Sequence, residues 1–241
     1  MPSDWFRVPI LMYHRIDRPN PCSKVSGHYV SPGLFRRQMK AMAALGYHTM
    51  PLSRLREGGP DPVKRAFCIT FDDGYENYLT NALPELKLRG FTATVFLVTQ
   101  MVGRENLWDS ASGDVREKLL SHTQVMECRT AGTEFGSHTL SHADLSTCSD
   151  EEARKQIFDS KEAVEELTGQ PTVCFCYPYG RFTASSRDLV KEAGYAVACS
   201  TRKGVATPET DRFALPRINV RRDTSVPVLM LKLLRGAYLG R

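Results

Sequence analysis

Short apolar runs alternate with amphipathic segments along most of this chain. Residues 66–71 have the length and composition of a buried strand, whereas residues 149–168 carry helix signals, with Ser149 at the N-terminal cap and Gly169 as the stop. The alternation repeats about six or seven times, and strands joined through helices pair in parallel. The sequence therefore predicts an α/β fold. Without a linker or an internal repeat, we expect one domain over residues 1–241.

The individual elements follow from the same patterns. The expected strands are residues 8–13, 66–71, 91–98, 133–137, 172–177, 195–199 and 213–220. The expected helices are residues 31–46, 76–89, 121–131, 149–168 and 185–193. Pro84 removes a backbone donor, so the second of these helices kinks there or starts near Ala82. This periodicity fits a closed barrel and an open doubly wound sheet equally well.

Composition narrows the classes of function. The chain has 241 residues, with 32 Lys and Arg against 27 Asp and Glu, which gives a net charge of +5. The excess is mild and scattered, and without a recognition motif we expect no nucleic-acid binding. Seven cysteines without a CxxC pair are typical of reduced, mostly buried thiols in a cytosolic protein.

The two ends of the chain bear on its location. Residues 1–7 lack the apolar stretch of a signal peptide, and no run reaches the ~18 residues of a membrane span. We therefore expect a cytoplasmic protein. Residues 226–235 are apolar with interspersed cations, so this segment either packs as the last helix of the fold or lies on a membrane surface.

Two adjacent carboxylates, Asp72 and Asp73, follow the strand predicted at residues 66–71. Adjacent residues at a strand end point in different directions, so one carboxylate can bind a metal while the other faces a substrate. Asp-Asp-Gly is also good turn sequence, and taken alone the pair would be interpreted as a turn. A pair of histidines further along the chain reverses that interpretation.

His138 and His142 follow the strand predicted at residues 133–137. A lone pair of histidines at this spacing is a weak signal. Here, however, both motifs follow strands, and the carboxyl ends of parallel strands form one functional face. One aspartate and two histidines would hold a divalent metal with a position left open for water. The spare carboxylate can then act as a base on that water.

Residues 70–74 (TFDDG) and 138–142 (HTLSH) resemble the first two motifs of the NodB-type polysaccharide deacetylases, carbohydrate esterase family 4. The resemblance covers roughly residues 8–220. It implies a distorted (β/α) barrel of about seven parallel strands. It also implies that Asp73, His138 and His142 bind the metal and that Asp72 is the general base.

Residues 175–180 (FCYPYG) resemble the third motif of the family. In the family, the backbone amide of the residue matching Tyr179 helps to hold the tetrahedral oxyanion, in a turn that here includes Tyr177 and Pro178. Many members have an arginine at the head of this motif that orients the base, whereas this chain has the FxYPYG form of the branch acting on poly-N-acetylglucosamine. We expect Arg217 or another arginine to supply the missing contact. The alternative is an aromatic turn that packs on the core.

The family's usual Leu-x-His motif, which carries the general acid, is absent, because residues 215–218 read Leu-Pro-Arg-Ile. The Asp-Trp motif that positions this histidine is also absent. In the circularly permuted poly-N-acetylglucosamine deacetylases an N-terminal strand bears the acid, and the strand predicted at residues 8–13 is followed by His14. The resemblance therefore implies His14 as the acid, with a strand-end histidine of no chemical role as the alternative. We expect the other three histidines at the surface or in the core: His28, His48 and His122.

Together the motifs imply a metal-dependent hydrolase that removes N-acetyl groups from GlcNAc units of a polysaccharide or its precursor and releases acetate. One divalent metal is implied; zinc suits a His₂Asp site, and cobalt, nickel, manganese or ferrous iron also fit. Trp108, Tyr177 and Tyr179 can offer aromatic faces to a sugar ring, or Trp108 lies in the core. Three alternatives stay open: an O-acetyl esterase, a cyclic-amide hydrolase on the same scaffold, and a non-catalytic glycan-binding relative.

Overall fold

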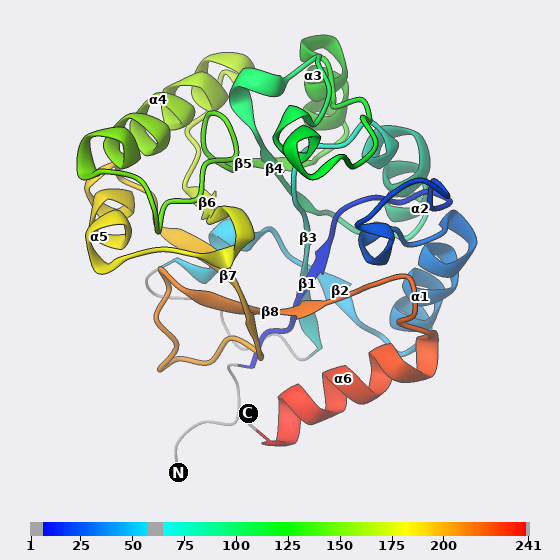
Figure 1. Ribbon diagram of the computed structural model, residues 1–241. Helices are drawn as coiled ribbons and strands as arrows, with labels where there is room; N and C mark the ends of the chain where they lie inside the picture. Colours follow the sequence, from blue (N-terminus) through cyan, green and yellow to red (C-terminus); the bar gives the residue numbers. More distant parts are fainter. Residues whose placement is uncertain (1–6, 57–64, 240–241) are drawn as a thin grey trace.

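Parallel strands close into a barrel in the computed structural model, which describes residues 7–56 and 65–239 (Figure 1). The barrel strands are β1 (Ile10–Tyr13), β3 (Ala66–Phe71), β4 (Thr94–Leu97), β5 (Glu134–Ser137), β6 (Cys174–Cys176), β7 (Val197–Lys203) and β8 (Leu215–Asn219). Their order is β1-β8-β7-β6-β5-β4-β3, and β1 closes the circle because it pairs with both β8 and β3. A short strand, β2 (His48–Thr49), pairs with β3 outside the circle. The predicted barrel is confirmed, and the open sheet is not formed.

Helices surround the barrel (Figure 1). They are α1 (Pro32–Ala44), α2 (Leu83–Lys87), α3 (His122–Thr130), α4 (Asp150–Thr168), α5 (Ala184–Glu192) and α6 (Val226–Leu239). Serine side chains cap three of them: Ser31 accepts a hydrogen bond from the amide of Leu34, Ser121 from that of Gln124, and Ser149 from that of Glu152. Gly169 ends α4 in the left-handed region, at a φ of 64°.

The segment predicted as a helix at residues 76–89 forms two shorter elements. A π-helical segment, η3 (Tyr78–Ala82), comes first, and α2 begins at Leu83. Pro84 lies in the first turn of α2, where a missing backbone N–H breaks no intrahelical hydrogen bond. The prediction of a helix that starts near Ala82 is therefore confirmed, and the alternative of a kink is not formed.

Small and flat side chains fill the narrow interior of the barrel. Four buried cysteines from three strands cluster there with Phe96: Cys68, Cys174, Cys176 and Cys199. All seven cysteines of the chain are free thiols, as the sequence predicts. A larger hydrophobic cluster joins the outer faces of the strands to the helices α1, α2, α3 and α6.

The last helix, α6, is buried on one side and exposed on another. Leu229 and Leu233 are buried in the outer cluster, so the prediction that this segment packs as the last helix is confirmed. Val228, Leu231 and Leu234 are exposed.

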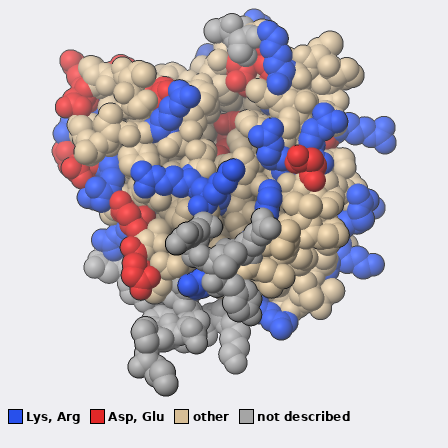
Figure 2. All heavy atoms as spheres, turned by 60° about the horizontal axis from the view of Figure 1, so that its bottom comes forward, with Lys and Arg blue, Asp and Glu red and all other residues tan. Residues whose placement is uncertain are grey.

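Figure 2 turns the lower side of the barrel toward the viewer. Lys and Arg side chains cross the middle of this face, and many of the Asp and Glu side chains lie along its left edge. Membrane contact along α6 stays a prediction, and none of the described helices is long and apolar enough to cross a membrane.

Gly136 allows β5 and β6 to come together beside a ring in the barrel interior. A Cβ atom built on Gly136 would lie 2.7 Å from the carbonyl oxygen of Cys174 and 2.7 Å from Cδ1 of Phe96. Side-chain carbons do not approach other atoms this closely, so any side chain at this position forces its neighbours apart.

We therefore expect Gly136→Ala to lower the free energy of unfolding by about 1–3 kcal/mol, because an overpacked core must shift backbone or rings. Urea denaturation followed by circular dichroism measures this loss. Gly33→Ala is the matched control, since the nearest atom to a Cβ on Gly33 is 3.8 Å away and the residue lies in α1. Equal stability of the two variants would contradict the close approach at Gly136.

Candidate active site

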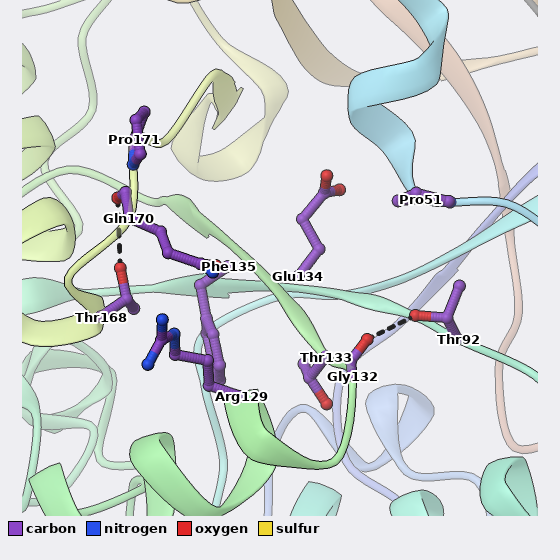
Figure 3. Close-up of a pocket in the computed structure, with 10 residues that line it drawn as sticks. All are labelled: Pro51, Thr92, Arg129, Gly132, Thr133, Glu134, Phe135, Thr168, Gln170 and Pro171. Carbon is purple, nitrogen blue, oxygen red and sulfur yellow. Dashed lines mark hydrogen bonds between the residues drawn. The ribbon is translucent and has the colours of Figure 1, made fainter.

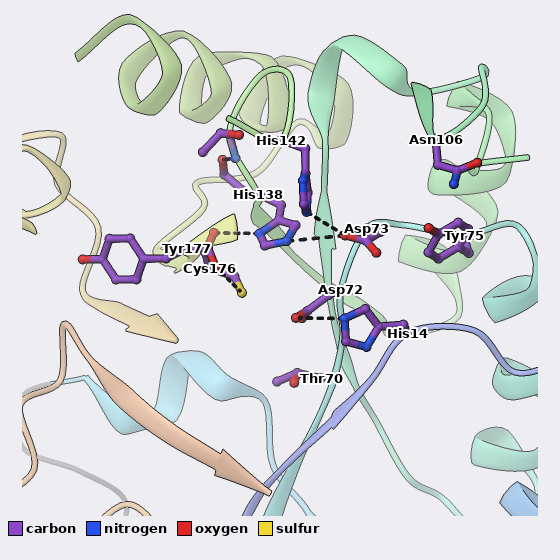
Figure 4. Close-up of polar contacts among 12 residues, drawn as sticks. His14, Thr70, Asp72, Asp73, Tyr75, Asn106, His138, His142, Cys176 and Tyr177 are labelled. Carbon is purple, nitrogen blue, oxygen red and sulfur yellow. Dashed lines mark hydrogen bonds and ion pairs between the residues drawn. The ribbon is translucent and has the colours of Figure 1, made fainter. Parts of the chain in front are cut away.

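Acidic and imidazole side chains meet at the carboxyl end of the barrel (Figure 4). Asp72 and Asp73 follow β3, whereas His138 and His142 follow β5, and all four residues are buried. His14 follows β1 and reaches the same place. The structure thus brings together the two aspartates and three histidines that the motifs identify.

Asp73 lies between the two histidines of the second motif. Its Oδ1 atom is 3.4 Å from Nε2 of His138 and 3.3 Å from Nε2 of His142. The ring of His138 is oriented from behind, because its Nδ1 lies 2.7 Å from the carbonyl oxygen of Cys176. A carbonyl can only accept a hydrogen bond, so Nδ1 carries a proton, and Nε2 is the ring atom directed at Asp73.

This triad fits a divalent cation. One donor atom from each of Asp73, His138 and His142 lies within 4.8 Å of the others, and all three side chains are buried. Asp73 Oδ1 is buried without a hydrogen-bond partner. A buried carboxylate oxygen without a partner costs free energy, and a bound cation would offset that cost. Two imidazoles and one carboxylate are the donor set of a catalytic zinc site, and a backbone carbonyl behind one imidazole is the usual outer contact.

Backbone strain is concentrated at the same place. Among the described residues, positive φ occurs at five positions other than glycine, and four of them lie in the site loops: Asp73, Thr139, His142 and Tyr179. Each costs of order 1–3 kcal/mol and persists only where the surrounding structure enforces it. Such strain is typical of functional loops, in which side chains must converge regardless of local preference.

Gln156 of α4 holds the loop that carries both histidines. Its Oε1 accepts hydrogen bonds from the amides of Leu140 and Ser141, each 3.1 Å long, and its Nε2 donates to the hydroxyl of Ser141. This contact could not be predicted from the sequence, because Gln156 looks like any polar residue of an amphipathic helix. It is buried, and that burial is the only sign of its role.

Arg217 of β8 holds Asp72. Two hydrogen bonds of 2.7 Å join the guanidinium to the two carboxylate oxygens, and both side chains are buried. Arg217 also donates to the Thr70 hydroxyl, the Ser200 carbonyl and the Cys176 sulfur. Burial by itself would raise the pKa of Asp72, but the charge and hydrogen bonds of Arg217 outweigh it and hold that pKa below its usual value. Arg217 of β8 therefore makes the contact with Asp72 that the arginine missing from the third motif would make.

His14 lies beside this pair. Its Nε2 is 3.9 Å from Oδ2 of Asp72. Burial, followed by the neighbouring His28, lowers the pKa of His14 to about 3, although Asp72 and Asp73 oppose the shift. His28, expected at the surface or in the core, is partly buried, and its ring stacks on that of His14 at a centroid distance of 4.2 Å.

Two aromatic side chains form walls of the site. Trp108 stacks on His142 with ring centroids 4.7 Å apart, and Tyr179 meets the same imidazole edge-on at 4.6 Å. Trp108 is half-buried and Tyr179 is 47% exposed, so both rings remain accessible at the mouth. Trp108 therefore lies at the site and not in the core.

Tyr177 does not contribute a surface to the site, and the prediction that it offers a face to a sugar ring is wrong. Its ring is fully buried and packs against Phe175 and Phe182, and Figure 4 shows it pointing away from the histidines. Successive residues of a strand point to opposite faces, so Cys176 turns inward to Arg217 and Tyr177 turns outward. Pro178 is buried beneath the same turn.

Arg15 anchors the loop that carries Trp108. The guanidinium donates to the Tyr75 hydroxyl at 2.5 Å and lies 3.1 Å from Glu117 and 3.4 Å from Asp109. Arg15 is buried directly after His14, so the first of these two residues lies in the site and the second holds the loop. This cluster could not be predicted from the sequence, because its acids are spread over an irregular loop.

A second hollow, of about 370 Å³, lies at the opposite end of the strands (Figure 3). Glu134, at the start of β5, and Arg129 are its charged lining residues, and Glu134 accepts hydrogen bonds from Thr94 and from the Ser53 amide. None of the motif residues lines it. The chemistry-bearing residues are therefore confined to the carboxyl end.

The family model described as polysaccharide deacetylase matches residues 59–198, more than half of the chain. This chain belongs to the polysaccharide deacetylase family. The match includes all three motifs but leaves out β1 and β8, the neighbouring strands that supply His14 and Arg217. The family that the motifs resemble is thus confirmed.

Several known proteins are similar to this chain over most of its length. A poly-beta-1,6-N-acetyl-D-glucosamine N-deacetylase from Staphylococcus epidermidis is 26% identical over 235 residues, which span 88% of this chain and 78% of the relative. A deacetylase from Streptococcus pyogenes, solved with acetate, has a TM-score of 0.81 at 26% identity and covers 94% of this chain and 98% of its own. A polysaccharide deacetylase from Bacillus cereus has the same TM-score at 27% identity, covering 95% and 69%.

We expect Arg217→Met to lower the free energy of unfolding by about 3–5 kcal/mol, because it leaves the buried carboxylate of Asp72 without its partner. Urea denaturation at neutral pH measures the change. Arg154→Met is the control, since Arg154 makes a similar two-bonded contact with Glu192 but on the exposed surface. Water replaces that lost partner, so its effect should be much smaller. Similar losses in the two variants would show that burial of Arg217 and Asp72 does not set their contribution.

Proposed function

We propose that this deacetylase-family protein is a metal-dependent hydrolase that removes the N-acetyl group from GlcNAc units of a glycan and releases acetate. One observation carries the proposal: a buried triad of Asp73, His138 and His142 lies beside a second carboxylate, Asp72, that is ionised and fixed by an arginine. Three ligands with a separate base are the parts that metal-assisted amide hydrolysis needs.

Asp73, His138 and His142 would hold the cation. When bound, it would supply Lewis acidity, which polarises the acetyl carbonyl and acidifies a water molecule. Zinc suits this donor set, and cobalt, nickel, manganese and ferrous iron are compatible with it. Nε2 of both histidines already points at Asp73, so metal binding would require little rearrangement of the side chains.

Asp72 accepts the proton of the attacking water. The guanidinium of Arg217 occupies one lone pair on each carboxylate oxygen and leaves the others free. Because Arg217 lowers the pKa of Asp72, the carboxylate is ionised at neutral pH and available as a base. The oxygen of the water bonds to the carbonyl carbon, and the backbone amide of Tyr179 donates to the oxygen of the tetrahedral adduct.

His14 then delivers a proton to the departing nitrogen. With a pKa of about 3 it is neutral in the resting site, so it must obtain that proton during turnover. Asp72, 3.9 Å away, has just received one from the water. Transfer from Asp72 through His14 to the nitrogen allows the C–N bond to break, and acetate and a free amine result. An amide needs this protonation more than an ester does, which favours N-deacetylation over O-acetyl ester hydrolysis.

The substrate class follows from the walls of the site and from the relatives. Trp108 and Tyr179 leave aromatic surface at the mouth, which suits the apolar face of a pyranose ring. The relative from Staphylococcus epidermidis is named for poly-beta-1,6-N-acetyl-D-glucosamine, which supports an N-acetylglucosamine polymer or its precursor here. A cytoplasmic location, expected from the sequence, would favour the precursor.

The test is acetate release from N-acetylglucosamine oligomers by chelator-treated protein, with and without added zinc or cobalt. We expect release only with metal. Asp72→Asn should keep the metal and lose about 10²–10⁴ in turnover, because it removes the base alone. Asp73→Asn should lose the metal itself, measured by atomic emission of the dialysed protein.

Asp188→Asn, an exposed change on α5, is the control and should leave both readings unchanged. Metal loss in Asp72→Asn with retention in Asp73→Asn would mean that the two roles are exchanged. Hydrolysis of O-acetylated sugars without any action on N-acetyl groups would identify an esterase instead. A zinc-loaded protein that binds oligomers but cleaves neither bond would be a glycan-binding relative.

A further inference from the structure

The rings of His14 and His28 lie face to face. Their centroids are 4.2 Å apart and their planes differ by 21°. His28 ends a short 3-10 segment, η1 (Ser26–His28), and the backbone on both sides is fixed to the end of β1. The amide of Arg15 donates to the carbonyl of His28, and the amide of Val30 donates to the carbonyl of Arg15. The main chain therefore places the two rings against each other.

His14 has little other support within the described part of the chain. No hydrogen bond of its ring is found there, and its Nε2 lies 3.9 Å from Oδ2 of Asp72. The contrast with His138 is clear, because a carbonyl of Cys176 fixes that ring from behind. An imidazole that transfers a proton must keep both its plane and the direction of Nε2, so His14 needs an equivalent constraint.

We propose that His28 is a positioning residue for the general acid: its ring stacks on His14 and keeps Nε2 of His14 directed at the reacting nitrogen. The inference rests on the proposed function, since it takes His14 as the acid. Offset or parallel stacking of flat rings restricts rotation about the bond that joins a ring to its Cβ, and it does so without a hydrogen-bond acceptor. His28 thus takes the place of a carboxylate or carbonyl behind the acid.

The charges around His28 favour this stacked state. Burial lowers the pKa of His28, and Arg15 and Arg221 lower it further, while Asp73 and Asp72 oppose them. Arg221 follows β8 and packs so closely on the η1 turn that a Cβ on Gly27 would lie 2.1 Å from its Nη2. Burial, with the two guanidinium groups beside it, favours the neutral form of this imidazole, so the stack joins two uncharged rings and carries no repulsion at neutral pH.

The test compares His28→Ala with His28→Phe in zinc-loaded protein. Loss of the stack in His28→Ala should lower kcat for acetate release by about 10–100-fold while KM changes less than about threefold, because the ring orients the acid and does not bind the sugar. Phenylalanine keeps a flat ring in place, so His28→Phe should recover kcat to within about threefold of the wild type. His122→Ala, an exposed change at the start of α3, is the matched control and should have no effect.

A second reading reports on the ring of His14 without relying on turnover. The chain has six histidines, so isotope labelling of histidine gives few imidazole signals, and His14→Ala assigns the one of interest. The ring current of a stacked neighbour shifts the His14 signal upfield in the wild type and in His28→Phe, and we expect that shift to disappear in His28→Ala. Circular dichroism and zinc content confirm that each variant is folded and loaded.

The outcomes separate the two proposals. A wild type that releases no acetate but shows the upfield His14 signal would overturn the proposed function and leave the stack supported. An active wild type whose kcat is unchanged in His28→Ala would overturn the positioning role. Equal loss of kcat in His28→Ala and His28→Phe would also overturn it, since a ring nitrogen and not the stack would then be what His28 supplies.

Discussion

The buried contact between Arg217 and Asp72 is the interaction on which the site depends. A guanidinium and a carboxylate lose several kcal/mol each of hydration on burial, and only close geometry with satisfied hydrogen bonds offsets that loss. Arg217 meets this condition through Asp72, Thr70, Ser200 and Cys176. These partners lie on β3, β7 and β6, so one side chain from β8 joins four strands at the level of the chemistry. Asp72 is therefore held in place by contacts that involve four strands of the barrel.

The loops above this level are held differently. Asp73, Thr139, His142 and Tyr179 adopt left-handed backbone conformations that only glycine accepts without cost. Contacts from outside the barrel, such as those of Gln156, stabilise them. The rigid layer of strands thus fixes Asp72, while strained loops bring Asp73, His142 and the aromatic walls over it. Most of the non-glycine residues with positive φ in the described part of the chain therefore lie in the loops whose side chains meet at the site.

Much of this arrangement could be predicted, and the failures have physical reasons. The strand Ala66–Phe71 was predicted to the residue, because an apolar run meets a turn sequence at a sharp boundary. Arg217 was expected from a gap in the third motif, and the barrel does place it on Asp72. His28 and Gln156 were missed because their contacts join segments that the sequence does not show to be neighbours. Tyr177 was assigned to the site although strand alternation places it on the face opposite to Cys176.

The order of the strands explains how His14, which follows the first strand, lies beside motifs from the middle of the chain. A closed parallel barrel has no first strand: β1 pairs with β3 on one side and with β8 on the other. The functional face is defined by the carboxyl ends, and position along the chain does not enter. His14 therefore reaches Asp72 across the β1–β3 pair, and Arg217 reaches the same carboxylate through the barrel interior. The site requires only that the strands carrying its residues be neighbours around the closed barrel. A strand from either end of the chain can meet that requirement.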